Sequence, residues 1–222
     1  MKRLKFASIS LLMLVATRLE AGTYTPSSSY IQVHDFVITG QAPNVLYETA
    51  EKYQVVIGIY GTFVNYQARP VNISIKNGTL KDVFDAVVSA DPQLEWHETK
   101  KGSVHFINRR APLPLMDVIV ESFDARNPKS GDMYGLVSNI PEIHRWLRIH
   151  KCPTEATTMM AGSGQTQWED FSVHARNVPL FSIFDEVAAK SHTYFWSVMQ
   201  IGSHSCAINM QLREPEPWRK RP

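Results

Sequence analysis

The chain has 222 residues, of which 23 are basic, 21 are acidic and 44% are apolar. Residues 1–21 hold four of the basic residues and one acidic residue, so residues 22–222 carry 19 basic against 20 acidic groups and are close to neutral. Nucleic-acid binding requires basic residues clustered on one face, and this balance argues against a nucleic-acid partner. The remaining length suffices for two small domains or one continuous one.

The first 21 residues have the pattern of an export signal. Lys2, Arg3 and Lys5 precede an apolar run over residues 6–16, and residues 19–21 are a plausible cleavage site. The run is shorter than the roughly 20 residues that a transmembrane helix needs. We therefore predict a cleaved signal peptide and a periplasmic or secreted protein, with an uncleaved anchor as the alternative. We expect no integral membrane span after signal removal.

A polar leader and three elements follow the signal. Residues 22–30 are polar and serine-rich, and we predict a flexible leader there. Alternating or β-branched apolar residues predict strands, and apolar residues at helical spacing predict a helix between them. The resulting order is strand, helix, strand, over residues 31–38, 44–53 and 55–63.

The next stretch, residues 71–108, predicts a strand, a helix and a closing hairpin. The strand pattern covers residues 71–76, and two further strands, at 94–98 and 103–107, flank a turn at Gly102. In the helix, one stripe is apolar, formed by Leu80, Val83, Phe84, Val87 and Val88. Residues 31–110 thus predict one compact βαβ-βαββ unit, with helices packed on a small mixed sheet.

Residues 109–114, RRAPLP, are predicted to be a linker because two prolines and paired arginines interrupt both periodicities. A second set of elements follows: a strand at 115–123, a loop at 127–138, a helix at 141–151 and a turn at 161–165. Residues 213–222 contain three prolines and six charges, which predicts a disordered tail.

The stretch that begins at residue 171 repeats the one that begins at residue 71, at a constant offset of 100. The identities are Asn77, Leu80, Phe84, Asp85, Val87, Trp96, Gly102 and Ser103, which recur as Asn177, Leu180, Phe184, Asp185, Val187, Trp196, Gly202 and Ser203. Self-similarity at a fixed spacing is the signature of a supersecondary unit used twice. We therefore predict an α+β fold of two tandem repeats, with a second, more divergent copy over residues 115–212.

The order of strand, asparagine, turn, Leu-x-x-(Val/Ile)-Phe-Asp-x-Val helix and hairpin resembles the secretin and TonB N-terminus short domain of bacterial envelope proteins. The resemblance covers residues 36–108 and, more weakly, residues 116–210. It implies a small, non-catalytic periplasmic module without a cofactor, which docks an envelope protein such as an outer-membrane, secretion or transport component. Domains of this family normally precede a pore-forming, barrel or membrane-spanning region. This sequence shows none, so we expect either that the region belongs to another protein or that the role of the module has changed.

Docking could use either of two surfaces. A partner strand could add to an exposed sheet edge, or a partner surface could pack on the apolar side of a helix.

Two cysteines, Cys152 and Cys206, are candidates for a disulfide in an oxidising compartment. Closing so large a loop would stabilise the fold by roughly 4 kcal/mol in the chain-entropy description. The first unit has no cysteine at the corresponding places, so the fold does not require the bridge. Two buried thiols are the alternative.

No catalytic or metal site is predicted. The sequence has no G-x-S-x-G motif, no H-E-x-x-H motif and no phosphate-binding glycine loop. His97 and His105 are expected to face each other across the first hairpin, on a solvated face, where two ligands would make only a weak metal site.

Three residue pairs recur between the copies and are expected to have structural roles. The aspartates are expected on the solvated side of each helix, the tryptophans in the core, and the asparagines in turns. The pairs are Asp85 and Asp185, Trp96 and Trp196, and Asn77 and Asn177.

An alternative function is that of an envelope protein that binds a ligand or carbohydrate through exposed aromatic side chains. The candidates for such a stacking surface are Tyr60, Phe63, Tyr66, Trp168 and Trp218. An exposed aromatic cleft would favour this function, whereas a free strand edge would favour docking of a protein.

Overall fold

The computed structural model describes residues 27–63, 67, 69–126, 133–152, 171–201 and 207–212. The elements of the first half are η1 (Ser28–Tyr30), β1 (Gln32–Gln41), α1 (Ala42–Tyr53), β2 (Ile57–Thr62), β3 (Pro70–Thr79), α2 (Leu80–Ala90), β4 (Leu94–Glu98) and β5 (Val104–Asn108). Those of the second half are η2 (Pro114–Asp117), β6 (Ile119–Arg126), α3 (Met133–Ser138), α4 (Pro141–Ile149), β7 (Ser172–Pro179), α5 (Leu180–Lys190), β8 (Phe195–Ile201) and β9 (Ala207–Leu212).

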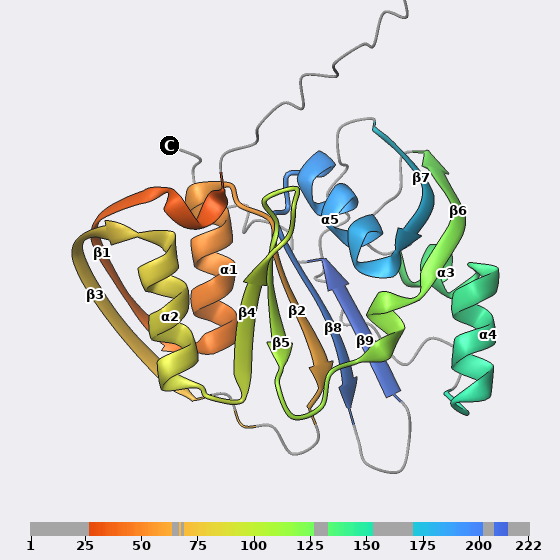
Figure 1. The fold of residues 1–222 in the computed structure, drawn as a ribbon, viewed down its shortest axis with the longest axis horizontal. Coiled ribbons are helices and arrows are strands. Elements are labelled where there is room, and N and C mark those ends of the chain that lie inside the picture. The colour runs from red at the N-terminus through yellow and green to blue at the C-terminus, as the bar shows by residue number, and fades with distance from the viewer. Residues whose placement is uncertain are drawn as a thin grey trace, which may run out of the picture.

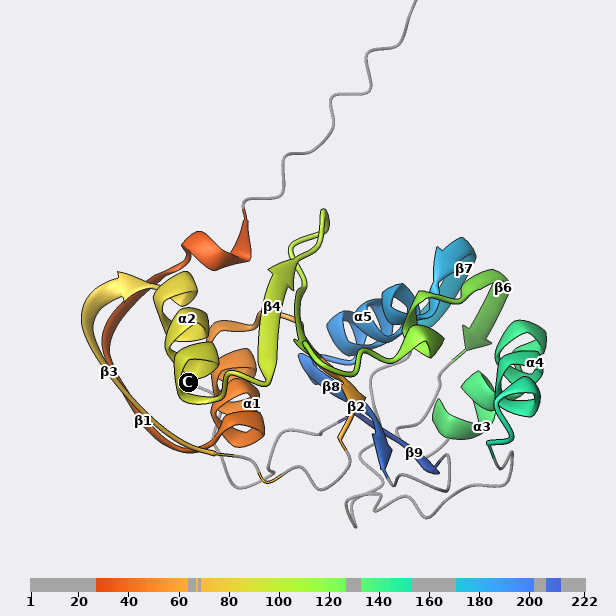
Figure 2. The same ribbon diagram turned by 60° about the horizontal axis from the view of Figure 1, so that its bottom comes forward.

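These elements pack around a central sheet (Figure 1). The sheet has the order β4-β5-β2-β8-β9; its three inner strands are parallel, and the two outer strands run antiparallel to them. Helices α1 and α2 lie on one side of this sheet and α5 on the other (Figure 2). The predicted α+β fold, with helices packed on a mixed sheet, is confirmed.

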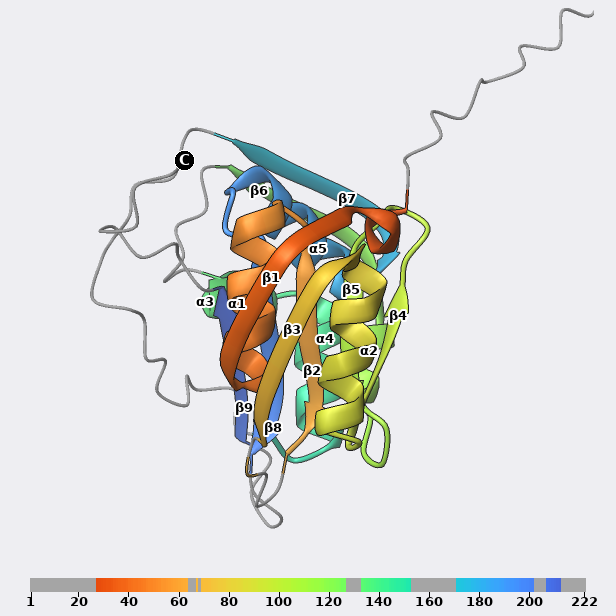
Figure 3. The same cartoon turned by 90° about the vertical axis from the view of Figure 1, so that its left-hand side faces the viewer.

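Two two-stranded antiparallel ribbons pack on the helices, one over α1 and α2 and the other on α5 and α4. One ribbon is β1 with β3, which crosses over α1 and α2 (Figure 3), and the other is β6 with β7. The ribbons leave one face to solvent, which is why their sequences alternate between apolar and polar residues.

Alternation along the central strands separates two cores. In β8, Phe195 faces the core under α1 and α2, whereas Trp196 faces the core under α5. In β2, Ile57 and Ile59 lie in the first core and Tyr60 in the second. Each half of the chain therefore contributes side chains to the core of the other.

The two halves are joined by the pairing of β2 with β8. The N–H of Ile57 donates to the carbonyl of Tyr194 at 2.8 Å, and the N–H of Phe63 donates to that of Gln200 at 2.9 Å. The predicted linker is also held in place, because the N–H of Thr62 donates to the carbonyl of Ala111 at 2.8 Å. The predicted units thus share one sheet.

The two long apolar helices have corresponding surroundings. The N–H of Leu80 at the start of α2 donates to the carbonyl of Ile31, and the N–H of Leu180 at the start of α5 donates to that of Val118, at 2.9 and 3.0 Å. Among the described residues, however, no strand between α4 and β7 corresponds to β2. The complete predicted repeat is therefore not confirmed.

Several local expectations differ from the structure. Residues 133–138 form α3 where a loop was predicted, because Val137 is buried against the second core. Asn77 and Asn177 lie within β3 and β7 and not in turns. The last residues of the predicted leader form η1, where the Ser27 hydroxyl and the Ser28 N–H donate to the Glu98 carboxylate.

Some expectations cannot be compared with the structure. The signal peptide, the turn at 161–165 and the tail at 213–222 lie outside the described residues. Within the described ranges, no helix is long and apolar enough to span a membrane.

The pairing of β2 with β8, which we call the joint, requires a glycine in β2. Gly58 lies opposite Trp196, and a Cβ on Gly58 would stand 2.2 Å from the indole ring. We expect Gly58→Ala to destabilise the protein by about 1–3 kcal/mol, because the ring must leave a well-packed core. Urea unfolding followed by circular dichroism measures this loss. Gly135→Ala in α3 is the matched control, since no atom beyond its chain neighbours and its own helix backbone lies within 4 Å of the added Cβ. Equal losses of stability in both variants would contradict the role assigned to Gly58.

Candidate functional site

A buried carboxylate in α5 is held by both halves of the chain. Asp185 accepts a hydrogen bond from the indole N–H of Trp196 at 2.8 Å, and both of its oxygens lie 3.1 Å from Nε2 of His105. His105 is completely buried and the Asp185 side chain is 10% exposed. Since an ionised carboxylate only accepts, Nε2 of His105 donates to it. A residue of β5 thereby fixes a residue of α5.

Aromatic rings enclose this contact. The Tyr60 ring is stacked on Trp196 with a centroid distance of 5.9 Å, and Phe181 meets the edge of His105 at 5.0 Å. Burial, reinforced by the carboxylates of Asp117 and Asp185, raises the pKa of Tyr60 well above its usual range. The enclosure keeps water away, which strengthens the hydrogen bonds to Asp185.

Two expectations about this region were wrong. His105 was expected on a solvated face and Asp185 on the solvated side of its helix, and both are buried. The physical reason is the pairing of β2 with β8, which brings α5 over the face of β5 that the first half leaves uncovered.

The first half contains the same arrangement around Asp85, but without the cover. The indole N–H of Trp96 donates to Asp85 at 2.9 Å. The ring of Phe84 lies 5.4 Å from that of Trp96, as Phe184 lies 5.3 Å from Trp196. The Asp85 side chain is 49% exposed and pairs with Lys81, and Trp96 is only partly buried. Asp85 therefore does lie on the solvated side of its helix, as expected.

The exposure of Trp96 follows from its strand, because β4 is the terminal strand of the sheet. The N–H of Thr99 donates to Ser103, and that of Arg109 donates to Gln93, both at 2.8 Å. Strand residues point alternately toward and away from their neighbour. Trp96 and Glu98 therefore direct their backbone groups away from β5, toward a side where no other described strand pairs. We call this the β4 edge.

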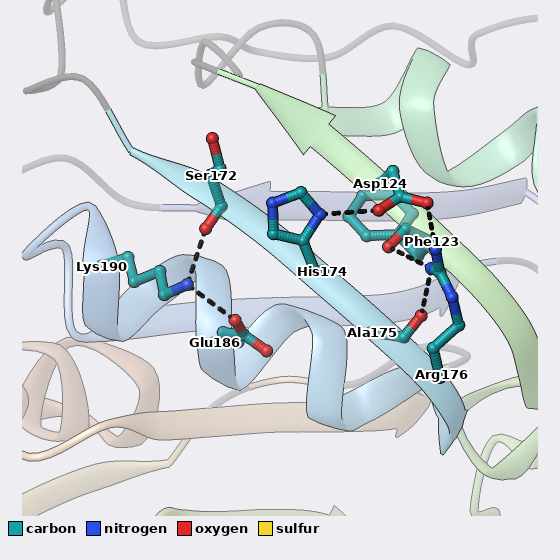
Figure 4. Close-up of polar contacts among 8 residues, drawn as sticks. All are labelled: Phe123, Asp124, Ser172, His174, Ala175, Arg176, Glu186 and Lys190. Carbon is teal, nitrogen blue, oxygen red and sulfur yellow. Dashed lines mark hydrogen bonds and ion pairs between the residues drawn. The ribbon is translucent and has the colours of Figure 1, made fainter.

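The second ribbon carries exposed polar contacts, which Figure 4 shows together. Asp124 of β6 accepts hydrogen bonds from His174 and Arg176 of β7, each at 2.7 Å, and these bonds lower the pKa of the Asp124 carboxyl. Lys190 of α5 donates to the carbonyl of Ser172 at 2.6 Å. The side chains of Asp124, His174 and Arg176 are about half exposed. We therefore assign them a structural role, the stabilisation of the pairing of β6 with β7.

Two histidines of the first hairpin lie side by side. His97 lies opposite His105, as predicted, with 5.2 Å between ring centroids. Among the described residues, no group of three or more His, Cys, Asp or Glu side chains is placed to hold a metal ion.

The other candidate residues are only partly within the described chain. Cys152 is buried after α4 and is not a free thiol. Cys206 lies outside the described residues, so the pairing of the two cysteines stays a prediction.

The aromatic residues proposed for ligand stacking give no exposed surface within the described chain. Tyr60 and Phe63 are buried, and Tyr66, Trp168 and Trp218 lie outside the described residues.

Comparison with known proteins adds no relative to this picture. No protein-family model matches the chain, and no match is found among curated proteins or solved structures. The resemblance to the secretin and TonB short domain therefore stays a prediction.

The sequence carries a signal for the Asp–Trp contact. Asp85 precedes Trp96 by the same 11 positions by which Asp185 precedes Trp196. Recurrence of a polar and an aromatic residue at one spacing indicates that the two side chains are in contact.

The two aspartates offer a matched test of burial. We expect Asp185→Ala to lower the free energy of unfolding by about 3 kcal/mol, because it leaves buried donors without an acceptor. Asp85→Ala should cost less than about 1 kcal/mol, because its contacts are exposed to solvent. Urea unfolding of both variants measures the two losses of free energy. Similar losses would contradict the assigned difference in burial.

The pH dependence of stability tests the surroundings of His97. Burial, followed by the neighbouring His105, lowers the pKa of His97, and the carboxylates of Glu95 and Asp117 partly offset this. The unfolded chain therefore binds a proton at a higher pH than the folded protein. The stability contributed by the neutral form is present above about pH 6.5 and should be lost as the pH falls from there through the lower pKa of the folded protein.

His97→Gln removes this contribution. We expect the unfolding free energy of the parent protein, minus that of the variant, to decrease as the pH is lowered from neutral to mildly acidic. Denaturation curves of the parent protein and the variant at neutral and at mildly acidic pH measure this difference. An increase of this difference at acidic pH would show that His97 is instead stabilised in its charged form.

Proposed function

We propose that this chain is a non-catalytic protein-interaction module of the bacterial cell envelope, located in the periplasm, which binds another envelope protein through a free strand edge. The observation that carries the proposal is the β4 edge. There the exposed Asp85 and the partly buried Trp96 form a contact whose counterpart in the second half is buried.

Sheet edges are natural acceptors for extended segments. Unpaired N–H and C=O groups of an edge strand bond to an added strand, while neighbouring side chains supply specificity. Trp96 and Glu98 offer such groups, and Trp96 offers an aromatic surface beside them. A strand that adds here would gain both backbone hydrogen bonds and apolar contact.

The sequence supports the location and the type of module. The pattern of residues 1–21 favours export. The observed order β1-α1-β2-β3-α2-β4-β5 is the order expected from the resemblance to the secretin and TonB short domain. An outer-membrane, secretion or transport component is the kind of partner that this resemblance implies.

The location has its own test. Cell fractionation followed by sequencing of the N-terminus should find the protein in the periplasmic fraction, with Gly22 as its first residue. Recovery from the cytoplasm with Met1 retained would contradict the proposal.

The interaction is tested by photo-crosslinking in intact cells. A photoreactive residue at Lys100, in the exposed turn that follows β4, should yield a discrete adduct with one envelope protein. The control position is Arg126, exposed at the end of β6 in the ribbon on the α5 side of the sheet (Figure 1). Further probes at exposed positions on the two ribbons complete the set. The absence of a reproducible adduct from every position would contradict the proposed function.

A further inference from the structure

We propose that the β4 edge receives an extended partner segment that runs parallel to β4, with a small residue opposite Trp96 and an aromatic residue two positions later. This deepens the proposed function and rests on it. The argument comes from the second half of the chain, where the equivalent edge is already occupied by β2.

The equivalence of the two edges rests on three contacts that both halves share. The helix start, the aromatic packing and the indole-to-carboxylate bond have nearly the same distances in each half: 2.9 and 3.0 Å, 5.4 and 5.3 Å, and 2.9 and 2.8 Å. Strand β8 therefore has the same relation to α5 as β4 has to α2. The edge of β8 that faces away from β9 corresponds to the β4 edge.

In the second half, β2 occupies that edge in parallel. Gly58 lies opposite Trp196 and leaves room for the indole ring, since any Cβ there would collide with it. Tyr60, two positions later, stacks on the same ring with an interplanar angle of 10°. The order small residue, any residue, aromatic residue is thus what this type of edge accepts inside the chain.

The presence of β2 beside β8 changes the solvent exposure of the aspartate and tryptophan side chains. Where β2 is present, Trp196 is 0% exposed and the Asp185 side chain 10%. Where no described strand is present, the Asp85 side chain is 49% exposed and Trp96 is partly open to solvent. A parallel segment at the β4 edge would complete the first half as β2 completes the second.

The turn η1 meets the β4 edge at Glu98, whose side-chain carboxylate accepts from Ser27 and Ser28. These bonds are to the carboxylate and not to the backbone groups that an added strand would use. Each turn precedes the first strand of its half, η1 before β1 and η2 before β6. The turn η2 coexists with the pairing of β2 and β8. The corresponding position of η1 is therefore compatible with an added strand.

The backbone N–H and C=O groups of β2 point alternately toward β8 and toward β5, and this alternation determines which peptides test the proposal. The N–H of Ile57 donates toward β8, whereas the carbonyl of Val56 accepts from Val104 of β5. By alternation, Ile59 also faces β8 and Gly58 faces β5. N-methylation at Ile59 should therefore block addition to β4, whereas N-methylation at Gly58 should leave it intact.

The probe is a synthetic peptide with the sequence of residues 55–63 and lysines added for solubility. Three matched peptides accompany it: one methylated at the nitrogen of Ile59, one methylated at that of Gly58, and one with Gly58→Val. Binding is followed by NMR on the full mature chain at millimolar peptide. The signals observed are the indole N–H of Trp96 and the backbone amides of Trp96 and Glu98.

We expect the parent peptide and the Gly58-methylated peptide to shift these signals and to slow exchange of the two amides. The other two peptides should bind at least about tenfold more weakly, the effect of one lost hydrogen bond or one steric clash. Equal binding of all four peptides, no binding at β4, or binding at β9 instead would overturn the proposal.

Two further outcomes would also overturn it. Protection of the Trp96 and Glu98 amides without peptide would show that the same chain already covers the edge. Protection that grows with protein concentration would assign the edge to a second copy. An adduct at Lys100 together with no binding of the parent peptide would leave the proposed function intact while this inference fails, so the two are separable.

Discussion

The parallel pairing of β2 with β8 is the interaction on which the rest of the structure depends. It places both halves on one sheet, brings α5 over β5 and sets His105 against Asp185. A buried carboxylate is stable only when donors satisfy it, and here the donors come from β5 and β8. The second half is therefore completed by residues of the first, and Gly58 is the residue that lets the strands approach around Trp196.

The two halves contain the same helix and hairpin, but among the described residues another strand covers the edge of the hairpin only in the second half. Around Asp185 the arrangement is closed by the chain itself, whereas around Asp85 it ends at an outer strand. Such an edge must also resist unwanted pairing. The strand β4 has only five residues and carries Glu95 and Glu98, both of which limit non-specific strand addition. A short, charged edge with one aromatic anchor suits selective docking.

The sequence predicted the regular elements well where their period was strong. The strand predicted at 94–98 is β4, and the stripe of Leu80, Val83 and Phe84 gave α2. The short helix α3 was missed because Gly135 and the polar residues before it are typical of loops.

The buried cluster was missed for a different reason. His105 and Asp185 are 80 positions apart, and local alternation gives the face of a strand but not what covers that face. A usable signal was present in β2, since Ile57, Gly58, Ile59 and Tyr60 have no polar alternation. Such a run is typical of a strand that is covered on both faces and has neighbours on both edges.

Native-state hydrogen exchange of two amides tests the shared sheet most directly. The N–H of Ile57 donates to Tyr194, next to β8 in the second half, whereas the N–H of Val104 donates to Val56, next to β2 in the first half. If the joint is integral to the fold, both amides exchange only through global unfolding and report the same free energy. Exchange of Ile57 through an opening of clearly lower free energy, with Val104 still protected, would show that the halves separate and would contradict the account.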